Sequence, residues 1–182
     1  RRTHPIGDIV NSSPAYAEDT KTVYIGANDG MLHAINADST DTSYRGKVLF
    51  SYVPKGIDYT AMASLSATAY EHRYFVDGQI DVTSRANQGN GRNILVAALG
   101  RGGRGVFALD VTNPTAMTTS SALWDETTQD TTTEPNMGYV LGRVLIRKGN
   151  GDKTYAFVPN GIESPNGSAT LFVYELDANG GI

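Results

Sequence analysis

An all-β fold is the prediction from this 182-residue sequence, and three observations support it. Short runs rich in β-branched and aromatic residues recur along the chain, each bounded by Gly, Asn, Asp or Pro. A strand–turn–strand pattern occurs three times along the chain. Helical spacing is weak and confined to residues 59–72. Together these features predict blades of a β-propeller, in which each blade is a small antiparallel sheet.

The predicted strands are short and rich in Val, Ile, Leu, Phe and Tyr. In chain order they are TVYIGA, MLHAIN, KVLFSYV, HRYFVDG, NILVAAL, GVFALDV, RVLIRK, KTYAFVP and TLFVYELD. Residues 59–72 favour a short helix and an ordered loop equally, because Ser and β-branched residues weaken the helical pattern. Residues 112–134 are rich in Thr and Ser and are predicted to form a surface loop within the domain, with Trp124 as a core anchor or a lid over a blade.

The repeated unit is a hairpin with a Gly-containing turn. It occurs at residues 23–37, 94–111 and 155–178, so the chain holds about three blades. Known propellers close with about four to eight blades, and three therefore do not close a ring. We expect either flanking blades of the same chain or a partner to cover the exposed blade faces.

The first hairpin turns at Ala27-Asn28-Asp29-Gly30. Asn, Asp and Gly tolerate the positive φ angles of tight turns, which favours a simple chain reversal. The alternative is that Asn28 and Asp29 offer oxygen ligands to calcium, but calcium takes six to eight oxygens from several segments. The sequence favours the turn.

Composition excludes several classes of function. The chain has no cysteine, which removes disulfides, thiolate metal sites and cysteine nucleophiles. Its net charge of −4 gives no electrostatic basis for binding nucleic acid, and no apolar run is long enough to span a membrane. Twenty Gly, ten Tyr and only 19% charged residues are typical of an extracytoplasmic β-protein.

The histidines and the aspartates at strand ends do not predict a catalytic or metal site. His4, His33 and His72 lack the spacing of zinc ligands and are interpreted as structural or surface residues. Asp residues that follow strands usually cap turns, and this interpretation applies to Asp77, Asp110 and Asp177. Whether two of them act as a glycosidase pair depends on a separation that the sequence does not give.

The Gly-rich segment GRGGRG, residues 100–105, is interpreted as a hairpin turn between two strands. It resembles a phosphate-binding loop, yet it lacks the following helix and the Lys-Ser/Thr ending. Arg101 and Arg104 form a candidate cationic pair for an acidic partner. That hypothesis loses its basis if both side chains pair with carboxylates of the same chain. No residue is therefore predicted to be catalytic, cofactor-binding or metal-binding.

Several segments resemble the C-terminal β-propeller of the PilY-type family, the type IV pilus tip-associated adhesins and pilus biogenesis factors. The matching segments occur in the family's order: GDIVNSSP, VYIGANDGMLHAI, HRYFVDG, GRGGRGVFALDVTNP, MGYVLG and GIESPNGSATLFVYELDANGG. The resemblance covers nearly all of residues 1–182, which are interpreted as part of one such propeller domain. It implies a modified seven-bladed, quinoprotein-like propeller at or near the pilus tip, outside the cell.

The resemblance also implies a role and partners. The segment is expected to support pilus assembly and surface adhesion without catalysis, with pilins or minor pilins and a host or abiotic surface as partners. The family's calcium ion is expected in an Asp/Asn-rich loop outside this segment, because the local candidates at 149–153 and 177–181 lack a run of oxygen ligands. Two alternatives remain: a quinoprotein dehydrogenase propeller, and a structural subunit that assembles with copies of itself.

Overall fold

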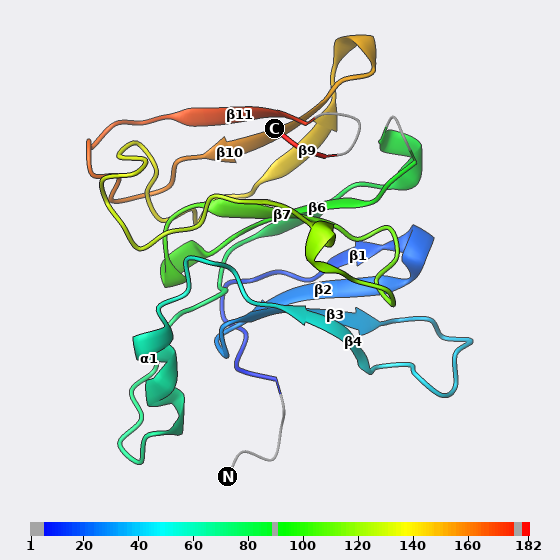
Figure 1. Ribbon diagram of the computed structural model, residues 1–182, viewed down its shortest axis with the longest axis horizontal. Coiled ribbons are helices and arrows are strands. Elements are labelled where there is room, and N and C mark those ends of the chain that lie inside the picture. Colours follow the sequence, from blue (N-terminus) through cyan, green and yellow to red (C-terminus); the bar gives the residue numbers. More distant parts are fainter. Residues whose placement is uncertain (1–5, 89–90, 177–179) are drawn as a thin grey trace.

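Three antiparallel sheets stacked one above another form the body of the molecule (Figure 1). The computed structural model describes residues 6–88, 91–176 and 180–182. We call the sheets blades 1, 2 and 3 in chain order. Blade 1 contains β1 (Ala15–Ala17), β2 (Thr22–Ala27), β3 (Met31–Asn36) and β4 (Val48–Tyr52). Blade 2 contains β5 (Ile80–Val82), β6 (Ile94–Ala98), β7 (Val106–Asp110) and β8 (Ala122–Asp125). Blade 3 contains β9 (Leu145–Lys148), β10 (Thr154–Pro159) and β11 (Leu171–Leu176).

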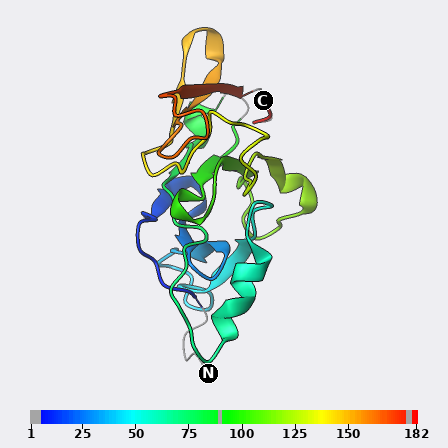
Figure 2. The same ribbon diagram turned by 90° about the vertical axis from the view of Figure 1, so that its left-hand side faces the viewer.

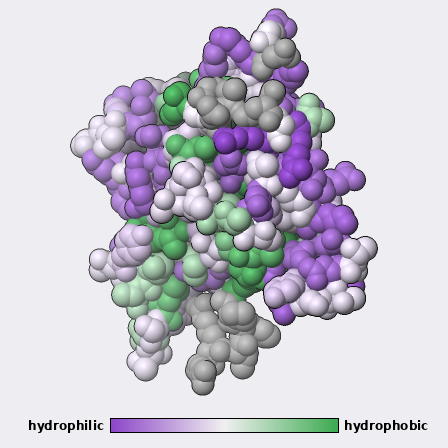
Figure 3. Space-filling model, turned by 45° about the vertical axis from the view of Figure 1, so that its right-hand side comes forward, coloured by the Kyte–Doolittle hydropathy of each residue, from purple (hydrophilic) through white to green (hydrophobic). Residues whose placement is uncertain are grey.

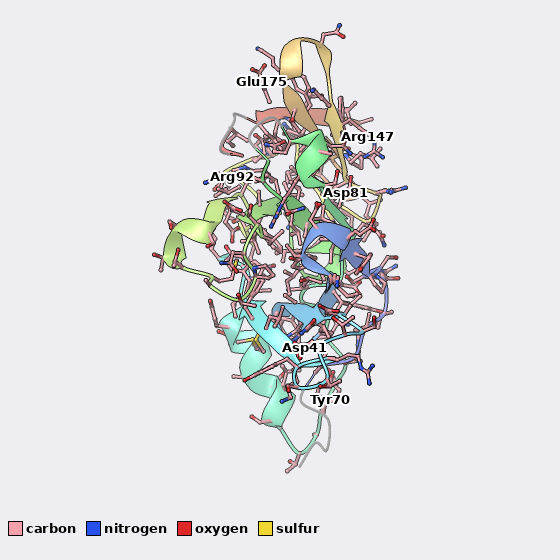
Figure 4. The ribbon with its side chains drawn as sticks, turned by 90° about the vertical axis from the view of Figure 1, so that its right-hand side faces the viewer. Asp41, Tyr70, Asp81, Arg92, Arg147 and Glu175 are labelled. Carbon is pink, nitrogen blue, oxygen red and sulfur yellow. The ribbon has the colours of Figure 1, made fainter. Side chains whose placement is uncertain are left out.

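The three predicted hairpins are confirmed as β2–β3, β6–β7 and β10–β11, the second and third strands of each blade. The first strands lie next to one another, since β5 contacts both β1 and β9. Asp81 of β5 accepts a hydrogen bond of 2.8 Å from the Ile146 backbone N–H and pairs with Arg147 of β9 at 3.3 Å (Figure 4). This contact joins blades 2 and 3 at their first strands.

Blade 2 is buried on both faces. Along β6, Leu95 and Ala97 belong to the core shared with blade 1, whereas Val96 and Ala98 belong to the core shared with blade 3. Successive side chains of a strand point to opposite faces, so a sheet between two others needs apolar residues at every position. This requirement explains the uninterrupted apolar run ILVAA of β6.

The short segments differ from the prediction in several places. HRYFVDG, residues 72–78, is not a strand; its backbone instead contacts the turns of blades 1 and 2. Residues 112–134 are not a continuous surface loop, because they include β8, the fourth strand of blade 2. Trp124 lies in β8 with only 9% of its surface exposed and donates a hydrogen bond of 3.0 Å to the Gly180 carbonyl. Its interpretation as a core anchor is confirmed.

One short α-helix occurs within the described residues, α1 (Tyr59–Ala63), followed by the 3-10 turn Ser64–Ser66. The Asp58 carboxylate caps its start by accepting a hydrogen bond of 2.9 Å from the Ala61 N–H. The Ser64 hydroxyl then bonds back to the Ala61 carbonyl at 2.6 Å, and the helix ends there. The further 3-10 turns are Glu18–Thr20, Arg85–Asn87, Gly100–Gly102, Thr119–Ser121 and Asn150–Asp152.

Hydrophobic surface remains exposed between hydrophilic residues on one side of the molecule (Figure 3). The outward face of blade 3 contributes two large exposed side chains, Leu171 at 61% and Val173 at 50%. We call Tyr155, Phe157, Leu171 and Val173 the open face of blade 3, since paired strands place them on the side away from blade 2. Among the described residues, the helices are too short and too polar to cross a bilayer.

Candidate functional site at the hairpin end

One end of the three blades carries most of the long connections, and we call it the hairpin end (the left side of Figure 1, facing the viewer in Figure 2). In an antiparallel four-stranded blade, the turn between strands two and three lies at the same end as the connection to the next blade. The hairpin end therefore gathers the turns 28–30, 99–105 and 160–170 and the connections 53–79 and 126–144.

The turn Asn28-Asp29-Gly30 reverses the chain, as predicted. Gly30 adopts a φ of +91°, which L-residues with a side chain rarely take. The turn also fastens its neighbours. Asn28 is fully buried, and its side-chain oxygen accepts a hydrogen bond of 2.9 Å from the Phe75 N–H. Asp29 accepts one of 2.7 Å from the Gly7 N–H. The turn thus holds segments that lie 22 and 47 residues away in the sequence.

Asp29 belongs to a polar chain that runs through the buried His33 ring to Ser51, which is exposed. The His33 ring bonds Asp29 through Nε2 at 2.9 Å and the Ser51 hydroxyl through Nδ1 at 2.7 Å. Burial opposes ionisation of Asp29, but hydrogen bonds from His33 and from the Gly7 and Met31 N–H groups outweigh it and hold the pKa of this carboxyl below its ordinary value. The carboxylate is thereby held as an anion in the turn.

This Ser–His–Asp contact was missed by the sequence analysis. His33 on β3 and Ser51 on β4 lie opposite each other, whereas Asp29 is four residues before His33, so no local motif connects all three. The ring nitrogens are used in the reverse of the order found in serine hydrolases, where Nε2 contacts the serine. Asp29 also accepts hydrogen bonds from the backbone N–H groups of Gly7 and Met31, so its carboxylate stabilises the turn.

The other predicted polar residues are spread over separate places. His72 pairs with Asp8 at 2.6 Å in an exposed position, so His33 and His72 are structural and surface residues as interpreted. Asp77 accepts hydrogen bonds from the Asn11 N–H and side-chain amide at 3.0 and 2.6 Å. Asp110 caps the following turn through the Thr112 N–H at 3.0 Å. His4 and Asp177 lie outside the described residues.

The Gly-rich segment 100–105 forms a tight β6–β7 turn rather than a phosphate-binding loop, as predicted. A Cβ atom on Gly102 would lie 1.7 Å from the Phe75 carbonyl oxygen, so only glycine permits this close approach. Arg101 lies over the Tyr74 ring, with 5.6 Å from the guanidinium carbon to the ring centroid, and Arg104 lies over Tyr139 at 4.6 Å. In the described part of the chain, neither arginine pairs with a carboxylate.

A second polar network, centred on Asp125, joins blades 1 and 2 at the hairpin end, and the sequence did not predict it. The Asp125 carboxylate accepts hydrogen bonds from the Tyr52 hydroxyl at 2.7 Å and from the Lys55 N–H at 2.9 Å. Burial, followed by the bond to Asp125, raises the pKa of the Tyr52 hydroxyl well above its ordinary value, so Tyr52 stays a neutral donor. The two partners lie more than 70 residues apart, beyond the reach of a local pattern.

Metal-ion chemistry has little support in these residues. Within residues 6–88, 91–176 and 180–182, no group of three or more His, Asp or Glu side chains is placed to hold a metal ion. The candidate at 149–153 forms a 3-10 turn beyond β9, and most of the candidate at 177–181 lies outside the described residues. Calcium takes six to eight oxygen ligands from several segments, and the described carboxylates are not gathered in that way.

Repeated antiparallel sheets with apolar cores between them, and polar side chains that fasten turns, define a β-propeller segment. Residues 3–182 match the family model described as the PilY1 beta-propeller domain. The chain therefore belongs to the PilY1 β-propeller domain family, which confirms the resemblance found in the sequence.

Individual relatives agree with this assignment. The chain is 31% identical over 208 residues to a type IV pilus biogenesis factor PilY1 homolog of Xylella fastidiosa, covering 97% of this chain and 13% of that protein. It is 30% identical over 206 residues to the type IV pilus biogenesis factor PilY1 of Pseudomonas aeruginosa PAO1, covering 97% and 16%. The crystal structure of the Pseudomonas aeruginosa PilY1 C-terminal domain superposes with a TM-score of 0.60 at 28% identity, over 87% of this chain and 29% of that one. The chain thus spans a small part of its relatives.

Proposed function

We propose that this chain is a non-enzymatic β-propeller segment of a type IV pilus-associated protein and that it supports pilus assembly and surface adhesion. The observation that carries the proposal is the match of residues 3–182 to the PilY1 β-propeller domain, together with relatives that are pilus biogenesis factors. The expected location is the cell surface or the pilus tip. Pilins or minor pilins, and a host or abiotic surface, are the expected partners.

The proposal of a non-enzymatic role rests on how the polar residues of the hairpin end are used. Asp29, His33 and Asp77 bond to backbone groups or to one another and hold separate segments together. A rigid platform of this kind presents a defined surface to a partner protein. We keep the family's calcium ion as part of the proposal for the full-length protein, in a loop outside this segment.

A further blade is proposed to cover the open face of blade 3. The third-strand residues Ala34 and Ala108 pack toward the following blade, in the cores that blade 1 shares with blade 2 and blade 2 with blade 3. Val173 holds the equivalent place in β11, paired with Phe157 on the face away from blade 2, and is half exposed. The repeat therefore supports a fourth sheet at this position, supplied by the same polypeptide.

An in-frame deletion tests the function in the bacterium that carries the protein. Residues 6–182 are removed from the full-length protein, and surface pili are counted by electron microscopy beside a strain that carries the intact gene. We expect fewer pili per cell, although the truncated protein is still produced and exported. An unchanged number of pili, with the truncated protein present in normal amounts, would refute the proposed role in assembly.

A dye-linked dehydrogenase assay tests the quinoprotein alternative. The full-length protein is incubated with pyrroloquinoline quinone, calcium and an alcohol. We expect no turnover above the rate without protein, because the polar groups described at the hairpin end are engaged in structural bonds. Turnover that depends on the quinone would refute the non-enzymatic interpretation.

A further inference from the structure

A small cavity at the hairpin end lies between the turns of blades 2 and 3 and the connections that lead into those two blades. It has a volume of about 200 Å³ and is lined by Tyr74, Arg101, Tyr139, Ile162 and Glu163, which we call the Arg–Tyr pocket. Tyr74 comes from the connection between blades 1 and 2, Arg101 from the β6–β7 turn and Tyr139 from the connection into blade 3. The β10–β11 turn supplies the remaining wall.

Backbone contacts fix the walls of the Arg–Tyr pocket relative to one another. Tyr139 and Ile162 exchange two backbone hydrogen bonds, of 2.8 and 3.1 Å. Arg104, beside the pocket, exchanges two with Thr128, of 3.0 and 2.9 Å. The close approach of Gly102 to the Phe75 backbone fixes the turn that carries Arg101 against the segment that carries Tyr74. A pocket with fixed walls loses little conformational freedom when a ligand enters it.

The two guanidinium groups are held by aromatic rings and not by carboxylates. Arg101 and Arg104 lie over the rings of Tyr74 and Tyr139, and a contact of this kind uses the guanidinium charge without using its N–H donors. Arg104 donates one long hydrogen bond of 3.5 Å to the Glu163 carbonyl, and its Nε is enclosed with no hydrogen-bond partner among the described residues. The contact with the Tyr139 ring therefore holds the Arg104 guanidinium in position, although its Nε loses the hydrogen bond that water would supply.

Glu163 adds strain and negative charge to the rim of the pocket. Its φ is +56°, and among the described residues Glu163 and Lys21 are the non-glycine residues with a positive φ. Such strain persists where the surroundings over-determine the conformation, and it gathers at binding sites. The Glu163 carboxylate at the rim weakens the attraction of the pocket for any anion.

We propose that the Arg–Tyr pocket binds a carboxylate side chain on an acidic segment of a partner protein, with Arg101 as the principal contact. Arginine matches the planar carboxylate through paired N–H donors. The tyrosine rings and Ile162, which is 51% exposed, suit the apolar or aromatic neighbours of an acidic residue in a peptide. This inference goes beyond the pilus proposal and does not depend on it.

Saturation-transfer NMR on the full-length protein tests the inference with a blocked peptide, acetyl-Gly-Phe-Glu-Phe-Gly-amide. Its dissociation constant is compared with that of the peptide in which Gln replaces Glu, and inorganic phosphate is added as a competitor. We expect the Gln peptide to bind at least about tenfold more weakly, the loss expected for one charge-assisted hydrogen bond. We also expect phosphate to displace the acidic peptide poorly, because phosphate has no apolar groups to contact the tyrosine rings and Ile162.

Three variants locate the binding. Arg101→Gln should weaken the acidic peptide about tenfold, and Glu163→Gln should strengthen it, because a repelling charge is removed. Arg45→Gln, on an exposed loop at the opposite end, is the matched control and should leave the affinity unchanged. Thermal unfolding confirms that each variant is folded. Equal affinities for the two peptides, or equal losses in Arg101→Gln and Arg45→Gln, would overturn the inference, as would phosphate that competes as strongly as the peptide.

Discussion

Replacing Phe107 by alanine tests whether blades 1 and 2 share one core. Phe107 is fully buried in β7, and its ring centroid lies 5.1 Å from that of Tyr52 in blade 1. It belongs to the same cluster as Tyr24 and Leu32 of blade 1. The alanine variant removes the ring from this contact and leaves a cavity between the two sheets.

The size of the effect follows from the burial of the ring. Truncating a buried phenylalanine costs about 3–5 kcal/mol of unfolding free energy, through lost transfer energy and the cavity that remains. For a unit of this size, each kcal/mol lowers the melting temperature by about 2–4 °C, so a decrease of roughly 6–20 °C is expected. Tyr16, which is 54% exposed in β1, serves as the control, and Tyr16→Ala should change stability by less than about 1 kcal/mol.

Urea unfolding followed by intrinsic fluorescence measures both variants, and Trp124 in blade 2 is the reporter. Phe107→Ala should shift the midpoint to lower urea with little change in slope. A loss below about 1 kcal/mol, or a loss equal to that of Tyr16→Ala, would mean that Phe107 is not packed between two sheets.

The remaining predictions concern the polar networks of Asp29 and Asp125 and the close approach of Gly102 to the Phe75 backbone. Because the folded pKa of Asp29 is lowered, its contribution to stability is present above the unfolded pKa of about 3.9 and is lost as the pH falls through the folded value. Asp29→Asn should therefore be less stable at pH 7 and lose less stability on acidification, and equal slopes against pH would contradict this. Asp125→Ala should cost about 2–4 kcal/mol in urea unfolding, and more than Tyr52→Phe, because several donors lose their acceptor. Gly102→Ala should lower the melting temperature more than Gly46→Ala, whose Cβ would meet no atom within 4 Å and whose φ of +76° adds only local backbone strain; the opposite order would argue against the Phe75 contact.

The sequence predicts those parts of the fold that depend on local pattern. Strands β2, β3, β6 and β7 follow from dense apolar and β-branched runs, and the turn at 28–30 follows from its Asn-Asp-Gly chemistry. The hairpin repeat then predicts the blades. β1 and β5 have three residues each, too few for a period of two to stand out, and their pairing with longer strands decides their structure.

Tertiary contacts decide what the sequence analysis missed. β8 lies in a Thr- and Ser-rich segment, and it forms because Trp124 packs into the core between blades 2 and 3 and because its backbone pairs with β7. Residues 72–78 have strand composition, but their backbone groups bond to the turns of neighbouring hairpins, as in the contact from the Phe75 N–H to Asn28. The Asp125 and His33 networks join residues from different strands, so sequence spacing gives no sign of them.

Cysteine labelling at position 173 of the full-length protein tests most directly whether these sheets are consecutive blades of a larger propeller. Residues 1–182 contain no cysteine, so Val173→Cys adds one new thiol within this segment, on the open face of blade 3, and Thr40→Cys adds one on an exposed loop as the control. Labelling by a maleimide is followed by mass spectrometry of the peptides. Coverage by a further blade predicts that position 173 reacts at least about tenfold more slowly than position 40, since a locally open state is required. Equal rates in the folded full-length protein would contradict the propeller arrangement proposed for this face.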